Sequence, residues 1–396
     1  MTRPNSVHLI IKPISAVCNL NCAYCYYLGK KKLFPYTKNF AIDDRLLEIV
    51  IRQYIHEQAG DTIDFTWQGG EPTLLGLDFF KKAVRIQKKH AGAKTITNDL
   101  QTNGTLLDDE WCVFLRENGF LVGLSVDGPP ALHDTYRLDA RGNGTCNKAL
   151  AAAGLMNKHR VEFNTLTVVN RENAGHPGRV YRFLRDEIGA RYMQFIPCAD
   201  KADARVVAAK RGGWDPHAPG STDLVTESSV VAEDYGDFLC TVFDHWHRHD
   251  VRRVFVMTFE ATLNLLLQRP SPLCFFAPSC GKSLAVEHDG SVYSCDHFVA
   301  PEYRLGNIQE QGLAALATAP GQEKFGLNKL RHVSNDCRTC TYFDLCYGEC
   351  PKNRFVPDGH GGPAKNYLCP GLKKYFAHVV PHLLAMKRIL QDSGLV

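Results

Sequence analysis

Three cysteines near the start of the chain have a spacing that could hold a metal cofactor. Cys18, Cys22 and Cys25 form the pattern C-x3-C-x2-C, and the next cysteine along the chain is Cys112. Thiolates bind zinc or iron–sulfur clusters, and the spacing alone does not choose between them. A cubane cluster held by three thiolates has one iron without a protein ligand. That iron can bind a substrate or cofactor, just as the open coordination position of a catalytic zinc can. We therefore expect the missing fourth ligand to mark a binding site.

Eight further cysteines form a second group towards the C-terminus. Eight thiolates complete two sites of four ligands each. These eight and the three of the triplet account for eleven of the fifteen cysteines. The eight are Cys274, Cys280, Cys295, Cys337, Cys340, Cys346, Cys350 and Cys369. The other four, which we expect to be small buried hydrophobic residues in or beside helices and strands, are Cys112, Cys146, Cys198 and Cys240.

The elements that must position these cysteines alternate between strand and helix. Apolar runs, several ending in turns, predict strands within 7–14, 63–72, 95–105, 121–130, 162–170 and 191–198. Apolar stripes at helical spacing predict helices within 42–60, 77–92, 108–120, 145–159, 178–188 and 230–249. This alternation of β–α units implies a parallel sheet, either doubly wound or closed towards a barrel. In both arrangements the chemistry lies at the carboxyl ends of the strands.

Conspicuous polar turns follow three of the expected strands. They read QGGEP at 68–72, QTNG at 101–104 and SVDG at 125–128. Because the carboxyl ends of parallel strands meet at one edge of the sheet, we expect these turns to converge with the cysteine loop. The polar, Gly- and Pro-containing stretch 199–232 predicts an insertion or linker.

Composition narrows the class of protein. The chain has 396 residues, 44% of them hydrophobic, and a net charge of +4, a basic bias too weak to indicate nucleic acid binding. No apolar run approaches the roughly 20 residues of a membrane span. We see no signal peptide, and therefore expect a cytoplasmic protein with no membrane partner. Cysteines in that compartment stay reduced, which favours metal ligation over disulfides.

Several motifs together resemble a known family. Cys18-x3-Cys22-x-Tyr24-Cys25, followed by GGEP at 69–72, is similar to the radical S-adenosylmethionine (SAM) superfamily, and the C-terminal cysteines resemble its SPASM extension. The motifs QGGEPTL, LQTNGTL, LVGLSVDGP and DGSVYSCD resemble anaerobic sulfatase-maturating enzymes. The resemblance implies an α/β fold: a partial (β/α)6 barrel of parallel strands with a cysteine-rich C-terminal iron–sulfur (SPASM) domain. We expect the barrel in 1–232, with its insertion near 199–232, a linking helix and strand in 233–273, and the SPASM domain in 274–396.

The resemblance also implies roles for individual residues. The first triplet would hold a [4Fe–4S] cluster whose open iron binds the amino and carboxylate groups of SAM. The turn of Gly69, Gly70 and Glu71 would meet the amino group, since glycines permit close approach and a carboxylate pairs with an ammonium. The remaining expected SAM contacts are Tyr24 at the adenine, Ser125 at the ribose and Arg137 nearby.

The C-terminal cysteines would hold two auxiliary [4Fe–4S] clusters, which makes three in all. By their position in the family pattern, the first set is Cys274, Cys280, Cys295 and Cys350, and the second is Cys337, Cys340, Cys346 and Cys369. Asp296 follows Cys295 directly, where sulfatase-maturating enzymes carry the proposed catalytic base. Gln101 and Asn103 would hydrogen-bond the substrate backbone, although alone they could simply cap a turn.

The implied reaction is oxidation of a Cys or Ser side chain to formylglycine in an unfolded sulfatase segment of the Cys/Ser-x-Pro-x-Arg type. A low-potential donor such as flavodoxin or ferredoxin would supply electrons. An alternative is a radical maturase of ribosomal peptides that forms thioether or carbon–carbon crosslinks. Many such enzymes carry an N-terminal leader-binding domain, for which the position of Cys18 leaves no room. A zinc-binding module is a third, less favoured hypothesis, because the triplet is followed by the glycine turn.

Overall fold

The computed structural model describes residues 7–202, 224–359 and 361–394, and the chain divides into two compact units. The first unit comprises Met1–Val126, Arg137–Thr165 and Cys280–Leu327, and the second comprises Asp127–Tyr136, Leu166–Ser279 and Asn328–Val396. Most of the insertion expected near 199–232, namely 203–223, lies outside the described residues. The expected domain boundaries at 232 and 274 stay predictions.

The first unit is built on a mostly parallel sheet with strand order β10-β9-β8-β1-β2-β3-β4. Strands β1 to β4 pair in parallel, β8 pairs in parallel with β1, and β9 and β10 follow antiparallel. The strands are β1 (His8–Lys12), β2 (Thr62–Trp67), β3 (Thr95–Thr102), β4 (Phe120–Ser125), β8 (Ser283–Glu287), β9 (Ser291–Tyr293) and β10 (Arg304–Asn307). The C-terminal segment therefore extends the sheet beside β1, which local patterns did not indicate.

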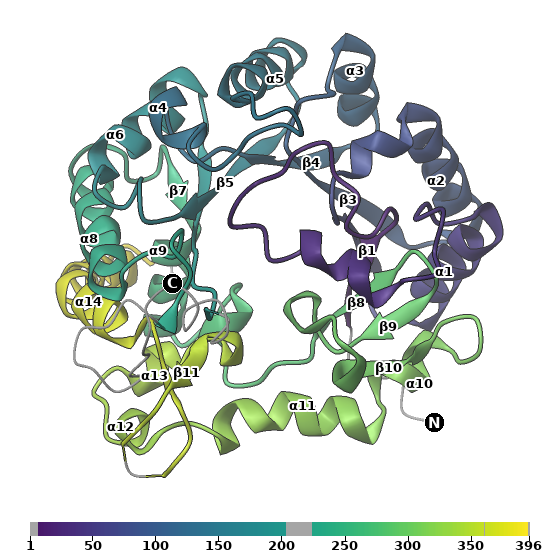
Figure 1. The fold of residues 1–396 in the computed structure, drawn as a ribbon. Helices are drawn as coiled ribbons and strands as arrows, with labels where there is room; N and C mark the ends of the chain where they lie inside the picture. The colour runs from purple at the N-terminus through teal and green to yellow at the C-terminus, as the bar shows by residue number, and fades with distance from the viewer. Residues whose placement is uncertain (1–6, 203–223, 360, 395–396) are drawn as a thin grey trace, which may run out of the picture. The chain divides into compact units, whose positions relative to one another are not determined.

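Helices cover one face of this sheet. They are α1 (Asp44–Glu57), α2 (Leu77–His90), α3 (Asp109–Glu117), α5 (Cys146–His159) and α10 (Leu313–Ala317), with short turns at Leu28–Leu33, Pro72–Leu75, Asp296–Phe298 and Pro301–Tyr303. Figure 1 shows α1, α2 and α3 on one side of β1 to β4 and the loop after β1 on the other. Asp43 caps α1 by accepting from the Leu46 N–H, and Asp108 caps α3 through Trp111.

The core of the first unit lies between the sheet and these helices. Fully buried strand residues such as Leu9, Phe65 and Trp67 face helix residues such as Leu47 and Phe80, and Trp67 and Phe80 meet edge to face with their ring centroids 5.8 Å apart. Burial of such large apolar side chains is the main stabilising contribution in a domain of this size. The sheet is a rigid scaffold for the loops at its carboxyl edge, where we expect the functional residues to lie.

The second unit contains a shorter parallel pair and several helices. Its strands are β6 (Tyr192–Pro197), which pairs in parallel with β7 (Phe255–Val256), and the antiparallel ribbon of β11 (Arg354–Val356) and β12 (Lys365–Asn366). Its helices are α4 (Pro130–His133), α6 (Pro177–Arg182) with a π turn at Phe183–Glu187, α8 (Ala232–His249), α9 (Met257–Leu266), α12 (Asn335–Arg338), α13 (Phe343–Cys346) and α14 (Cys369–Asp392), with 3-10 turns at Cys274–Phe276 and Pro351–Asn353. Strand β5 (Phe163–Val169) and helix α11 (Pro320–Arg331) run across boundaries between the units.

Helices α8, α9 and α14 form the core of the second unit. Phe243 and Phe259 meet edge to face at 5.2 Å, and the buried hydroxyls of Thr262 and Tyr375 lie 2.9 Å apart. Helix α14 contains 24 residues and begins at Cys369, the last cysteine of the chain. Among the described residues, no helix combines the length and apolar character needed to span a membrane. The predicted alternation of strands and helices is confirmed.

Candidate active site

The cysteine triplet lies in the loop that follows β1. Backbone hydrogen bonds from Ser15 to Lys12 and from Cys25 to Cys22, at 3.1 and 3.0 Å, fold this loop into successive turns. The Leu20 N–H lies 3.3 Å from the sulfur of Cys18. Burial is the largest cause that raises the pKa of the Cys18 thiol to about 11, and the charges of Glu71 and Cys25 add to it. Iron binding must displace that proton, as metal binding to thiols does in general.

The glycine turn after β2 packs directly against the cysteine loop. The Gly70 N–H donates to the Ser15 carbonyl at 2.6 Å, and the Glu71 N–H donates to the Val17 carbonyl at 2.8 Å. A Cβ added at Gly70 would lie only 1.9 Å from the Val17 oxygen, and Gly69 adopts a φ of +152°. Both positions therefore require glycine. The structure brings the predicted turn and the predicted cluster loop together.

Glu71 is buried and joins two loops. Its Oε1 accepts from the Thr73 N–H and hydroxyl and from the Thr102 hydroxyl, and its Oε2 accepts from the Asn103 N–H at 2.7 Å. Burial raises the pKa of this carboxyl, although these hydrogen bonds oppose the shift. The carboxylate thus ties the turn after β2 to the turn after β3. Its pairing with the SAM ammonium stays a prediction.

Asn103 lies beside the cysteine loop. Its Nδ2 donates to Asn19 Oδ1 at 2.9 Å and lies 3.9 Å from the sulfur of Cys18. Asn19 in turn donates to the Thr105 hydroxyl at 2.8 Å. These bonds order the loop, and a contact of Asn103 with the substrate backbone stays a prediction. Asn19 and Thr105 were not among the predicted site residues, although Asn19 stands between two expected ligands.

The other residues carried over from the family pattern form two pairs. Gln101, at the end of β3, donates to the hydroxyl of Ser125, at the end of β4, at 2.9 Å. The guanidinium of Arg137 lies over the ring of Tyr24, 5.6 Å from its centroid. The Asn21 N–H donates to the carbonyl of the residue after Arg137, at 2.8 Å, so this segment is bonded to the cysteine loop. Their contacts to SAM and to the substrate stay predictions.

Asp296 is held by two side chains from the N-terminal part of the chain. The hydroxyl of Tyr26 donates to Asp296 Oδ2 at 3.0 Å, and the ammonium of Lys12 lies 3.6 Å from the same oxygen. The side chain of Lys12 is 1% exposed and that of Asp296 is 13% exposed. Burial raises the pKa of Asp296, but the charges of His297 and Lys12 and the Tyr26 hydrogen bond outweigh it and lower the pKa to about 2.

Lys12, which was not among the predicted site residues, is surrounded by polar and aromatic side chains. Its ammonium also donates to Gln68 at 3.3 Å and lies 4.4 Å from the centre of the Tyr27 ring. The Tyr27 hydroxyl donates to the buried carboxylate of Glu287. The sequence feature that could have indicated a role for Lys12 is its place in IIKPI, where a charged residue ends an otherwise apolar strand. A buried ammonium requires such polar and anionic partners.

The expected second auxiliary set lies entirely in the second unit. Burial is the largest cause that raises the pKa of Cys346 to about 12, and the charges of Glu349, Cys369 and Cys337 add to it. Burial also raises the pKa of Cys369, with contributions from Cys337 and Cys340. Charge interactions thus connect Cys346 with Cys337 and Cys369, and Cys369 with Cys337 and Cys340, while the assignment of all four to one cluster stays a prediction.

The first auxiliary set divides between the units, with Cys280 and Cys295 in the first and Cys274 and Cys350 in the second. This set stays a prediction. Of the four cysteines expected to be buried, Cys112, Cys146 and Cys198 are buried and Cys240 is partly exposed.

The residues present fit the cofactors that the motifs imply. Among the described residues, no three Cys, His, Asp or Glu side chains converge as ligands of a single metal ion. The thiolates of a four-iron cluster bind separate irons and do not require such convergence. The turn of Gly69 and Gly70 packs on the backbone of the cysteine loop so closely that a Cβ at either position would collide with it, which holds the turn beside the triplet.

Comparison with known proteins identifies the family. Residues 13–184 match the radical SAM superfamily, and residues 274–341 match SPASM, an iron–sulfur cluster-binding domain. The serine-type anaerobic sulfatase-maturating enzyme of Bacteroides thetaiotaomicron is 42% identical over 391 residues, which cover 98% of this chain and 92% of that protein. The chain belongs to the family of anaerobic sulfatase-maturating enzymes. The predicted family and the [4Fe–4S] and SAM cofactors are thereby confirmed.

Further relatives of this sulfatase-maturating enzyme agree. The cysteine-type enzyme of Clostridium perfringens is 35% identical over 379 residues, covering 95% of this chain and 97% of that one. The solved structure of native anSMEcpe with bound AdoMet and the Cp18Cys peptide matches with a TM-score of 0.84 at 34% identity, over 97% of this chain and 99% of that chain. Streptococcus suis SuiB bound to its precursor peptide SuiA shares the fold alone, with a TM-score of 0.60 at 15% identity. The predicted α/β radical SAM fold is confirmed.

Proposed function

We propose that this enzyme oxidises a Cys or Ser side chain to formylglycine in a sulfatase segment of the Cys/Ser-x-Pro-x-Arg type. The observation that carries the proposal is the Asp296 carboxylate, fixed by Lys12 and Tyr26 in the same unit as the cysteine triplet. A carboxylate held there can take the proton that the oxidation releases. The similarity to serine-type and cysteine-type enzymes over nearly the whole chain supports the same reaction.

The chemistry requires a proton acceptor. When bound, the clusters and SAM supply the one-electron steps, which remove a hydrogen atom from the β-carbon and then an electron. The substrate thiol or hydroxyl must also lose its proton as the carbon becomes a C=S or C=O carbon. A serine yields the aldehyde directly, whereas a cysteine yields a thioaldehyde that water hydrolyses to the aldehyde with release of hydrogen sulfide. We propose that Asp296 accepts this proton.

The contacts of Asp296 distinguish its two oxygens. Oδ2 accepts from Tyr26 and faces the ammonium of Lys12, whereas Oδ1 lies 3.8 Å from the sulfur of Cys295. We infer that Oδ1 receives the substrate proton, because Oδ2 keeps its hydrogen bond from Tyr26, whereas the Cys295 thiol that donates to Oδ1 would lose its proton on binding a cluster. The low pKa of Asp296 keeps the carboxylate ionised at any working pH. A base is most effective when its pKa lies near the working pH, so transfer relies on the substrate group becoming more acidic as its carbon is oxidised.

Other groups would hold the cofactors and partners. Cys18, Cys22 and Cys25 would hold the cluster that binds SAM, with the glycine turn at the amino group and Tyr24, Ser125 and Arg137 at the nucleoside. Gln101 and Asn103 would reach the substrate backbone. A low-potential flavodoxin or ferredoxin would deliver electrons, and the reaction would take place in the cytoplasm, where sulfatase chains are still unfolded.

A peptide reaction tests the proposal. The reconstituted enzyme is incubated under anaerobic conditions with SAM, a reductant and a Cys-x-Pro-x-Arg or Ser-x-Pro-x-Arg peptide, and the products are read by mass spectrometry. We expect the serine peptide to lose two hydrogens and the cysteine peptide also to exchange sulfur for oxygen. A peptide with Ala at the target position is the control. An intrapeptide crosslink without aldehyde would overturn the proposal in favour of the crosslinking alternative.

A further inference from the structure

The segment between Cys346 and Cys350 has an unusual backbone. Tyr347, Gly348 and Glu349 follow one another with φ values of +50°, +70° and +53°. Residues with side chains rarely adopt this left-handed region, and usually do so singly. Helix α13 ends at Cys346, and the chain then turns through these three residues to Cys350. Such a conformation persists only where surrounding groups hold it.

One side chain holds all three residues. Arg354 donates from Nε to the Gly348 carbonyl at 3.0 Å, and from Nη2 to the Tyr347 and Glu349 carbonyls at 3.0 and 3.1 Å. A guanidinium has five N–H donors in a rigid planar fork, a geometry that lysine cannot reproduce. A Cβ added at Gly348 would lie 2.8 Å from Nη2 of Arg354, so the glycine leaves room for the guanidinium.

The other two donors of Arg354 reach the helix that supports Cys274. Nη1 donates to the Lys329 carbonyl at 2.6 Å and to the His332 carbonyl at 3.2 Å. The buried ammonium of Lys329 donates in turn to the carbonyls of Cys274 and Phe275, at 2.9 and 2.8 Å. Arg354 is therefore bonded to the residue whose side chain fixes the Cys274 turn.

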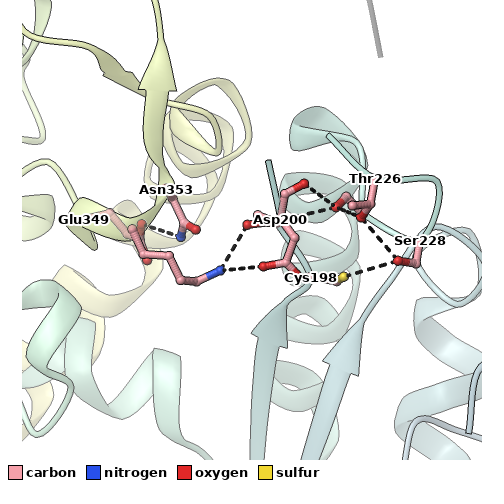
Figure 2. Close-up of polar contacts among 9 residues, drawn as sticks. Cys198, Asp200, Thr226, Ser228, Glu349 and Asn353 are labelled. Carbon is pink, nitrogen blue, oxygen red and sulfur yellow. Dashed lines mark hydrogen bonds and ion pairs between the residues drawn. The ribbon is translucent and has the colours of Figure 1, made fainter. Parts of the chain in front are cut away.

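A second contact fixes the segment through Glu349. Its buried carboxylate accepts from Asn353 at 2.9 Å and from Asn366 at 2.6 Å, and Figure 2 shows Glu349 bonded to Asn353. Asn366 also donates to the carbonyls of Gly348 and Cys350. In the same unit, Lys352 donates to the Ala199 carbonyl at 3.0 Å and lies 3.3 Å from Asp200, which Figure 2 labels. The backbone on both sides of Cys350 is thus fixed by polar contacts.

We propose that Arg354 is a positioning residue that fixes the Cys346–Cys350 segment and thereby sets the arrangement of the two auxiliary clusters. The inference rests on the proposed function and on the ligand sets implied by the family pattern, in which Cys346 belongs to the second cluster and Cys350 to the first. This segment is then the short covalent link between the clusters. If the electron removed from the substrate passed from one auxiliary cluster to the other, the geometry of this link would govern how well oxidation stays coupled to radical formation.

The test replaces Arg354 in the full-length reconstituted enzyme. Arg354→Gln removes the charge and most of the fork, and Arg388→Gln, on an exposed part of α14, is the matched control. Iron content, the magnetic coupling between the reduced auxiliary clusters in electron paramagnetic resonance, and the aldehyde formed per deoxyadenosine are measured. We expect altered coupling or lost auxiliary iron, and an aldehyde ratio lower by about 10- to 100-fold, as is typical when an outer contact of a metal site is removed. Arg354→Lys should restore the ratio only in part.

Three results would overturn the proposal. Unchanged coupling, iron content and aldehyde ratio in Arg354→Gln would show that the segment does not need the guanidinium. Loss of cofactor cleavage together with all clusters in both Arg354 variants would show that Arg354 supports the whole fold. If Cys346→Ala and Cys350→Ala removed the same cluster signal, the segment would not join two clusters. The wild-type peptide reaction would still report separately on the proposed function.

Discussion

The ammonium of Lys12 lies 3.6 Å from Oδ2 of Asp296, and both side chains are largely shielded from water. Lys12 ends β1, immediately before the loop of the cysteine triplet, and Asp296 follows an expected ligand of an auxiliary cluster. Removing one partner of a buried ion pair leaves an uncompensated buried charge. This destabilises the folded protein more than replacing both partners with apolar side chains does. The pair therefore links the loop of the radical cluster to the proposed base.

Lys12→Met should separate radical formation from product formation. Without the ammonium, Asp296 keeps only Tyr26 at Oδ2 and loses its fixed position. We expect the aldehyde formed per deoxyadenosine to fall by about 10- to 100-fold, the range typical of lost outer contacts in metal sites. Single-turnover assays with product analysis would measure both quantities.

Two matched variants control for Lys12→Met. Lys12→Arg keeps a cation and should recover part of the ratio. Lys81→Met breaks the exposed pair between Lys81 and Glu110, at 2.8 Å, and should leave the ratio unchanged, because exposed ion pairs contribute little. A ratio in Lys12→Met equal to that of wild type would remove Lys12 from the account of the site.

Gly70→Ala should abolish or strongly reduce deoxyadenosine formation. Its Cβ would lie 1.9 Å from the Val17 carbonyl oxygen, so the glycine turn must move away from the cysteine loop. Gly154→Ala in α5 is the matched control, because nothing lies within 4 Å of its Cβ. Alanine in the middle of that helix should even stabilise it, by about 0.5–1 kcal/mol. Wild-type cleavage of SAM by Gly70→Ala would show that the turn does not serve the cofactor.

The iron content should match three clusters. Eleven cysteines fit one set of three ligands and two sets of four, so the anaerobic enzyme should hold about 12 iron and 12 sulfide per chain. Replacement of Cys18, Cys22 and Cys25 by alanine should leave about 8 iron and abolish SAM cleavage. Saturation of the wild-type enzyme near four iron would contradict the two auxiliary sites.

Local patterns predicted much of the fold and the site. Hydrophobic periodicity located the strands and helices of the alternating region. Cysteine spacing and the glycine turn indicated the cofactors, because these ligands and their cradle lie within short stretches of sequence. The packing of Gly70 on Val17 gives that expectation its physical basis.

Contacts between distant segments were beyond the reach of such patterns. Lys12 and Asp296 are joined because β8 pairs in parallel with β1, and no local period specifies that pairing. Arg354 reaches three successive carbonyls only because the chain turns through left-handed residues, and Tyr347 and Glu349 are not glycines that would have marked such a turn. The substrate contact of Asn103 stays a prediction, and its bonds to the cysteine loop become apparent only in three dimensions.

The most direct measurement of the central claim uses Asp296→Asn with a peptide deuterated at the β-carbon of its target residue. The variant keeps the shape of the side chain but removes the basic carboxylate. Deoxyadenosine should still form and carry deuterium, whereas aldehyde should fall by roughly 10²–10⁴-fold, the contribution typical of a general base. The potentials of the clusters are measured in the same variant, because the lost charge lies beside Cys295. Aldehyde formation at the wild-type rate, with the potentials unchanged, would contradict the assignment of Asp296 as the proton acceptor.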